Sequence, residues 1–99
     1  PKTLIVRASG PSLGTLGVAG ALADPAVELR DGNGLLVALN DDWSSGSQAS
    51  AITASGFAPS DARESALLET LTPGAYTAIV RGANNGEGVA LIEIYDLDQ

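Results

Sequence analysis

The sequence contains no cysteine and no histidine among its 99 residues. The absence of cysteine excludes disulfides, thiolate nucleophiles and zinc sites with thiolate ligands. The absence of histidine excludes a Ser-His-Asp triad, and the only lysine is Lys2, so a serine nucleophile has no evident general base. We therefore predict that the chain has no catalytic residues and is not an enzyme.

Positive charge is also scarce, because five lysines and arginines face twelve acidic residues and give a formal net charge of −7. This balance opposes binding to the phosphates of nucleic acids and to anionic lipids. The sequence also has no apolar run of about 18 residues, the length that spans a bilayer. We expect neither a nucleic-acid partner nor membrane insertion.

Alternating apolar side chains predict three strands in the first 40 residues, at 3–8, 26–30 and 35–40. The sequence Asp31-Gly32-Asn33-Gly34 separates the last two. It is typical of a hairpin turn, because Asp-Gly and Asn-Gly accept positive φ angles. The glycine-rich residues 9–24 are too interrupted for a long helix and are predicted to form a packed crossing loop.

A long polar segment, residues 41–62, follows the third predicted strand. It is rich in Ser, Ala and Gly, and residues 48–54 could form a short helix that ends at Gly56. Most of its side chains suit a solvated surface. We expect three apolar side chains to attach this loop to the rest of the protein: Trp43, Ile52 and Phe57.

Three more strands are predicted in the last third of the chain, at 65–71, 75–81 and 88–95. Thr72-Pro73-Gly74 predicts a second hairpin between the first two, and Asn84-Asn85-Gly86 predicts a turn before the last. Pairing in chain order would make these strands a meander.

Six strands joined by turns, without a sustained helical period, predict an all-β fold. We expect an antiparallel β-sandwich, jelly-roll-like, of about 6–8 strands with one long, partly helical loop. The length favours a single domain over residues 1–99. No internal repeat is visible.

The sequence Asn40-Asp41-Asp42-Trp43 is the main candidate for a binding site. Oxygen ligands at the end of a strand suit Ca²⁺, and Asp96 and Asp98 could add ligands if the last strand lies alongside. The alternative is that Asp41 and Asp42 cap a turn by accepting backbone hydrogen bonds. We favour the turn, so we assign no metal ligands and no cofactor, and leave open whether these aspartates bind calcium.

Paired carboxylates could in principle supply the acid and the base for glycoside hydrolysis. With few aromatic side chains to form a sugar platform, we favour a solvated surface instead. The acidic residues in question are Asp41, Asp42, Glu64, Glu69, Glu87, Glu93, Asp96 and Asp98.

Two further segments are assigned to loop geometry. The glycines of residues 10–17 lack the Lys-Ser/Thr end of a phosphate-binding loop, and no helix pattern follows them. In Asp61-Ala62-Arg63-Glu64, Arg63 could organise the loop by bonding carbonyls or carboxylates. An exposed ion pair of this kind contributes only about 0–1 kcal/mol.

Five segments together resemble a β-sandwich repeat of large secreted and surface proteins of bacteria, similar to pre-peptidase C-terminal domains. They are LIVRASGPSL at 4–13, GALADP at 20–25, NDDW at 40–43, PGAYT at 73–77 and GVALIEIYD at 88–96. The resemblance implies a spacer, adhesion unit or enzyme appendage. In that family the segment like residues 1–8 usually follows further strand sequence, which implies an open sheet edge here.

The leading hypothesis is therefore a non-catalytic structural module of an extracellular bacterial surface or filament, which associates with copies of itself through an open sheet edge. The alternative is a carbohydrate-binding or adhesion module, which could be an accessory domain of a secreted enzyme and could bind surface glycans. That alternative requires at least two of its candidate aromatic residues, Trp43, Tyr76 and Tyr95, to be exposed on one side.

Overall fold

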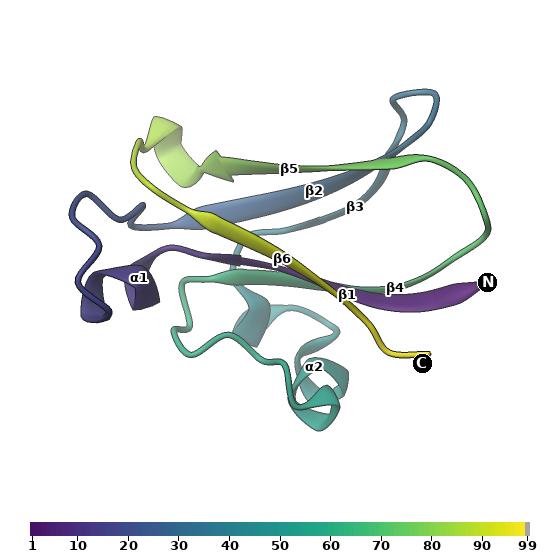
Figure 1. Ribbon diagram of the computed structural model, residues 1–99, viewed down its shortest axis with the longest axis horizontal. Coiled ribbons are helices and arrows are strands. Elements are labelled where there is room, and N and C mark those ends of the chain that lie inside the picture. The colour runs from purple at the N-terminus through teal and green to yellow at the C-terminus, as the bar shows by residue number, and fades with distance from the viewer. Residues whose placement is uncertain (99) are drawn as a thin grey trace.

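The computed structural model describes residues 1–98 and is mostly β (Figure 1). Two short α-helices, α1 (Pro11–Thr15) and α2 (Ala49–Ser55), lie in the connections. None of the helices in this range is long and apolar enough to cross a membrane. The strands are β1 (Lys2–Ser9), β2 (Pro25–Asp31), β3 (Leu36–Asn40), β4 (Ser65–Leu71), β5 (Tyr76–Gly82) and β6 (Leu91–Asp96).

The strands form two antiparallel sheets of three strands each, in the orders β4-β1-β6 and β3-β2-β5. The predicted all-β, antiparallel class is confirmed. The predicted hairpin between β2 and β3 is also confirmed. Asp31 Oδ1 accepts hydrogen bonds from the backbone N–H groups of Asn33 and Leu35, and Gly34 takes the positive φ of 81° that the turn requires.

The predicted second hairpin and the meander of the last three strands are wrong. β4 pairs with β1, β5 pairs with β2, and β6 returns to the other side of β1. Thr72-Pro73-Gly74 does reverse the chain, but the chain crosses from one sheet to the other as it turns. Turn residues determine where the chain reverses, but they do not determine which strands pair with each other. Here β1 and β2 are the central strands, and each takes two neighbours.

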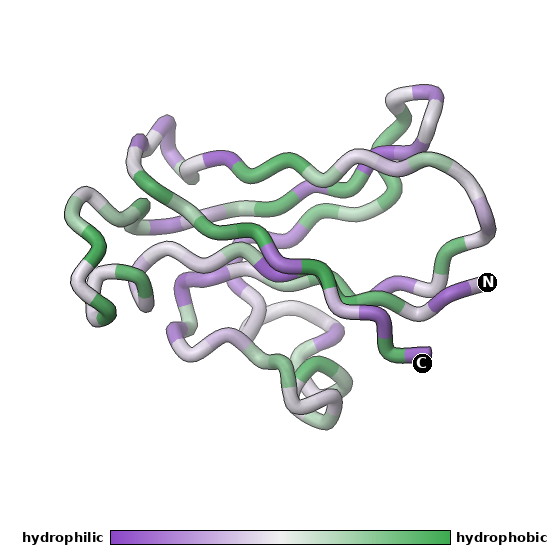
Figure 2. Tube along the Cα trace, in the orientation of Figure 1, coloured by the Kyte–Doolittle hydropathy of each residue, from purple (hydrophilic) through white to green (hydrophobic). Residues whose placement is uncertain are grey.

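A buried apolar cluster lies where the two sheets face each other, because it draws side chains from both. The members are Val6, Ala8, Val27, Leu29, Leu67 and Leu71. They follow the alternation expected of strands with one face turned inward. Figure 2 shows the corresponding alternation of hydrophobic and hydrophilic residues along the chain.

A second apolar cluster covers the opposite face of β1. The buried side chains of Ile5, Ile52 and Ala66 pack there, with Trp43 and Phe57 against them. Helix α2 and its flanking loop lie below the β4-β1-β6 sheet in Figure 1. The predicted helix and its attachment to the protein are confirmed, and Gly56 ends the helix with a φ of 82°.

The first strand, β1, does not lie at an open sheet edge. β1 is the central strand of its sheet and pairs with β4 on one side and β6 on the other. Its apolar residues on both faces are buried. Val6 lies between the sheets, and Ile5 lies under the helical loop, which is the connection between β3 and β4 that contains α2. A strand with two covered faces is suited to the middle of a sheet. Any open edge must therefore belong to another strand.

Candidate functional site

The two edges of the β4-β1-β6 sheet differ in whether side chains form hydrogen bonds with their outward-facing backbone groups. At the β4 edge, the side-chain amide of Gln48 donates a hydrogen bond to the carbonyl of Leu68 and accepts one from its N–H. Asn40 Oδ1 accepts the N–H of Ala66 at 3.0 Å. Side chains thus occupy positions that an added strand would use, so this edge is protected.

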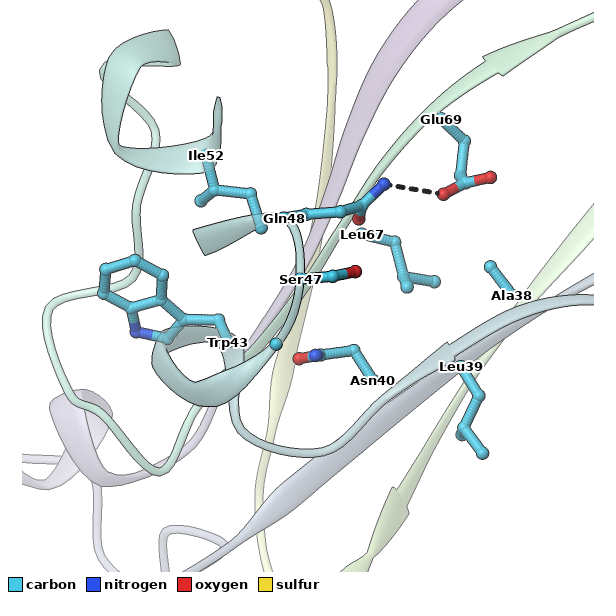
Figure 3. Close-up of a pocket in the computed structure, with 10 residues that line it drawn as sticks. Ala38, Leu39, Asn40, Trp43, Ser47, Gln48, Ile52, Leu67 and Glu69 are labelled. Atoms are coloured by element: carbon cyan, nitrogen blue, oxygen red, sulfur yellow. Dashed lines mark hydrogen bonds between the residues drawn. The ribbon is translucent and has the colours of Figure 1, made fainter. Parts of the chain in front are cut away.

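Figure 3 shows the surroundings of Gln48 at this edge. Its amide also bonds the carboxylate of Glu69 at 3.1 Å, drawn as the dashed line. The side chains of Asn40, Trp43 and Leu67 line the same hollow. Because the amide is already engaged with β4, the hollow serves as the junction between the helical loop and the sheet.

The β6 edge lacks this protection. Within residues 1–98, no side chain bonds the backbone groups on the outer side of β6. Three of its apolar side chains are exposed: Leu91 by 46%, Ile92 by 38% and Ile94 by 58%. An edge strand with free backbone groups and exposed apolar side chains is a template for pairing with another strand.

Two of these side chains belong to the inner face of the sheet. Ile92 pairs with Ala8, and Ile94 pairs with Val6. Directly opposed residues share a face of an antiparallel pair, and Ala8 and Val6 lie in the buried cluster between the sheets. The inner face is therefore incompletely covered at β6.

The outer face of β6 carries a polar and aromatic cluster. Arg7 donates hydrogen bonds to Glu93 at 3.0 Å and to the hydroxyl of Tyr95 at 3.3 Å, and that hydroxyl donates to Glu93. Phe57 stacks on Tyr95 with ring centroids 4.3 Å apart. The hydrogen bond from Tyr95 and the charge and hydrogen bond of Arg7 lower the pKa of Glu93. The cluster fixes β6 to β1 and to the helical loop.

β3 is a second edge strand with apolar exposure. It pairs with β2 only, and Leu36, Val37 and Leu39 are exposed by 50%, 39% and 59%. Leu39 pairs with Glu28, which lies on the outer face of its sheet. β3 and β6 thus belong to different sheets and present different surfaces.

The aspartates after β3 join a third one that sequence reasoning missed. One carboxylate oxygen each from Asp24, Asp41 and Asp42 lies within 4.8 Å of the others. Asp24 directly precedes β2 and the other two directly follow β3, and Val27 pairs with Asn40 in that hairpin. The predicted hairpin register could have found Asp24, because it places the start of β2 beside the end of β3.

Asp96 and Asp98, which could add ligands only if the last strand lay alongside, do not take part in this cluster. Asp96 forms an ion pair with Lys2 at 2.9 Å, and Asp98 accepts the N–H of Thr3. Both interactions fix the end of the chain beside β1. The condition is not met, because β6 lies on the far side of β1 from β4 and the loop that follows β3.

Glu64 organises the two loops that meet at the start of β4, a role not predicted for it. Its carboxylate is fully buried and accepts hydrogen bonds from Gly10 N, Ser12 N, Ser12 Oγ and Asp61 N. Arg63 instead forms an exposed ion pair with Asp61. The carboxylate of Glu64 thus occupies the N–H groups of the glycine-rich segment, which contains the short helix α1 where only a loop was predicted.

The three candidate aromatic side chains for sugar binding are half-buried and engaged within the protein. Trp43 Nε1 donates to the carbonyl of Asp61, the hydroxyl of Tyr76 donates to the carbonyl of Thr72, and Tyr95 takes part in the Arg7 cluster. A pair of exposed aromatic side chains on one face, which the carbohydrate-binding alternative requires, is not formed by these residues.

Comparison of the chain with protein-family models, with curated proteins and with solved structures gives no match.

Proposed function

We propose that this protein is a non-catalytic β-sandwich module that associates with copies of itself through the open edge at β6. The single observation that carries the proposal is the contrast within one sheet, where β4 is capped by Gln48 and Asn40 while β6 is bare and apolar. The acidic, cysteine-free composition and the resemblance to secreted bacterial repeats support a place on a cell surface or in an extracellular filament.

The partner strand that fits β6 best is β3 of another copy. Pairing β6 with β3 buries two apolar rows that are both exposed in a single chain. These rows lie on different surfaces, so the contact is heterologous, and a pair of copies keeps one free β6 and one free β3. Repetition of the contact adds copies in one direction and makes a filament or a chain of modules.

A single contact of this kind is weak. Full burial of one Leu or Ile side chain stabilises by about 1.5–3 kcal/mol, and each backbone hydrogen bond adds about 0.5–1.5 kcal/mol net. Association itself costs about 4–15 kcal/mol in lost freedom. We therefore expect assembly at high protein concentration or where modules are held close together.

The experiment is sizing chromatography with light scattering over a range of concentrations, together with electron microscopy. The native chain should form species larger than a monomer as concentration rises. Ile94→Lys should remain monomeric, because a lysine on an edge strand opposes pairing. The matched control is Leu16→Lys, which makes the same change at a side chain that is 79% exposed and lies outside the strands.

Leu16→Lys should assemble like the native chain. A native chain that stays monomeric at every concentration would disprove the proposal, and so would an equal loss of assembly in both variants.

A further inference from the structure

All five basic side chains of the protein are already paired with acidic ones. The charged atoms lie 2.8–3.1 Å apart in these ion pairs, which are Lys2–Asp96, Arg7–Glu93, Arg30–Glu28, Arg81–Glu28 and Arg63–Asp61. The chain has twelve acidic residues and a net charge of −7, so no basic side chain remains to neutralise the other carboxylates. Two copies that approach each other therefore repel.

Several of the remaining carboxylates lie just beyond the two exposed edge strands. Asp41 and Asp42 directly follow β3. Glu87 precedes β6, and Asp98 follows its end. Asp41, Glu87 and Asp98 are exposed, and none of the four carboxylates forms an ion pair within the described part of the chain. Unneutralised acidic side chains thus lie beyond one end of β3 and beyond both ends of β6.

The two strands themselves carry little free charge. β3, residues Leu36–Asn40, has no acidic or basic side chain. β6 has two acidic side chains, Glu93 and Asp96, and each is in an ion pair with a basic side chain of β1. A contact between β6 and β3 is therefore apolar along the strands and acidic beyond their ends.

The acidic ends meet whichever way the paired strands run. In an antiparallel pair, Asp41 and Asp42 lie toward the start of β6 and Glu87. In a parallel pair, they lie toward the end of β6 and Asp98. Like charges close together on paired strands are destabilising. Charged residues that flank an apolar strand are also a common means of limiting edge pairing.

We propose that ionic strength controls self-association, because the carboxylates of Asp41, Asp42, Glu87 and Asp98 oppose the contact between β6 and β3 until salt screens them. The inference rests on the proposed function and adds its regulation. The distance over which exposed charges act falls from about 30 Å at 0.01 M salt to about 8 Å at 0.15 M. The apolar contacts are not screened in this way, so added salt favours assembly. An interface held together by opposite charges would respond in the other direction.

The test is light scattering at several protein concentrations in NaCl from about 0.01 M to about 0.5 M. Association of the native chain should strengthen as NaCl rises. Asp41→Asn should associate about 1.5- to 5-fold more tightly than the native chain at about 0.15 M NaCl, because a like-charge contact is removed. It should also respond less to added salt. The double variant Glu87→Gln, Asp98→Asn, which removes the charges beyond both ends of β6, should behave in the same way.

The matched control is Ala54→Lys, which changes the net charge by the same amount as Asp41→Asn. Ala54 is exposed on α2, the helix that packs on the outer face of the other sheet. At about 0.15 M NaCl, Ala54→Lys should associate like the native chain, because its charge then acts only over about 8 Å.

Native association that stays the same or weakens as NaCl rises would overturn this inference and leave the proposed function standing. A full salt response in Asp41→Asn would also overturn it, because salt would then act on the apolar contact alone. Equal strengthening in Asp41→Asn and Ala54→Lys would assign the repulsion to net charge and overturn the role of the strand ends. The absence of association at every NaCl concentration would overturn both proposals.

Discussion

The β4 and β6 strands flank the same central strand, yet side chains cap the outward backbone groups of β4 and leave those of β6 free. The β4 edge is protected by Asn40, the last residue of β3, and by Gln48, which lies between β3 and β4. The β6 edge exposes Leu91, Ile92 and Ile94. The contrast shows that edge protection in this protein comes from two amide side chains, one at the end of β3 and one in the long loop that follows it. Where the loop does not reach, the edge stays available.

The largest expected effect comes from Glu64, which holds together the loops at the sealed side of the sheet. Glu64→Ala should lower the free energy of unfolding by about 3 kcal/mol or more, because it leaves several N–H donors unpartnered. Urea unfolding measures the change. Glu64→Gln, which keeps one carbonyl acceptor, should lose less. A loss below about 0.5 kcal/mol for the alanine variant, typical of a surface position, would show that the loops do not depend on this carboxylate.

A smaller effect is expected from removing the cap on β4. Gln48→Ala should cost about 1–3 kcal/mol, since the N–H and carbonyl of Leu68 lose their partners. It should also open the β4 edge in addition to β6 and β3, which light scattering would detect as stronger association than the native chain shows. Ser50→Ala, an exposed position in α2 two residues after Gln48, is the control. Unchanged association in Gln48→Ala would mean that the amide is not what seals this edge.

The smallest effect is a pH dependence at the bare edge. The pKa of Glu93 is lowered below its ordinary value of 4.5 by Tyr95 and Arg7. A carboxyl with a lowered pKa in the folded state contributes stability above pH 4.5, and that contribution disappears as the pH falls through the lower folded value. Glu93→Gln should lose this part of the acid dependence of Tm. Parallel Tm profiles for the two proteins across this window would contradict the expectation.

Much of the fold could be predicted from the sequence because the strands follow a period of two. The hairpin of β2 and β3 was also predictable, since Asp31 to Gly34 encode one specific turn. The partners of β4, β5 and β6 were not. Local turn residues such as Pro73-Gly74 set where the chain reverses, while burial across the whole molecule decides which sheet receives the next strand.

The candidate site was predictable only in part for the same reason. Asp41 and Asp42 stood out as neighbours in the sequence, whereas Asp24 reaches them through strand pairing. Glu64 gave no signal among twelve acidic residues, because its role depends on N–H groups more than 50 residues away. The capping by Gln48 depends on a loop whose path no local pattern specifies.

The central position of β1 has a consequence for how the protein acquires its structure. Residues 2–9 are made before both of their partners, residues 65–71 and 91–96. Contacts between such distant segments slow folding, because the chain must close large loops before they form. During synthesis, β1 cannot complete its pairing until residues 91–96 have emerged. The module should therefore fold late and as one unit, instead of growing stepwise from its beginning.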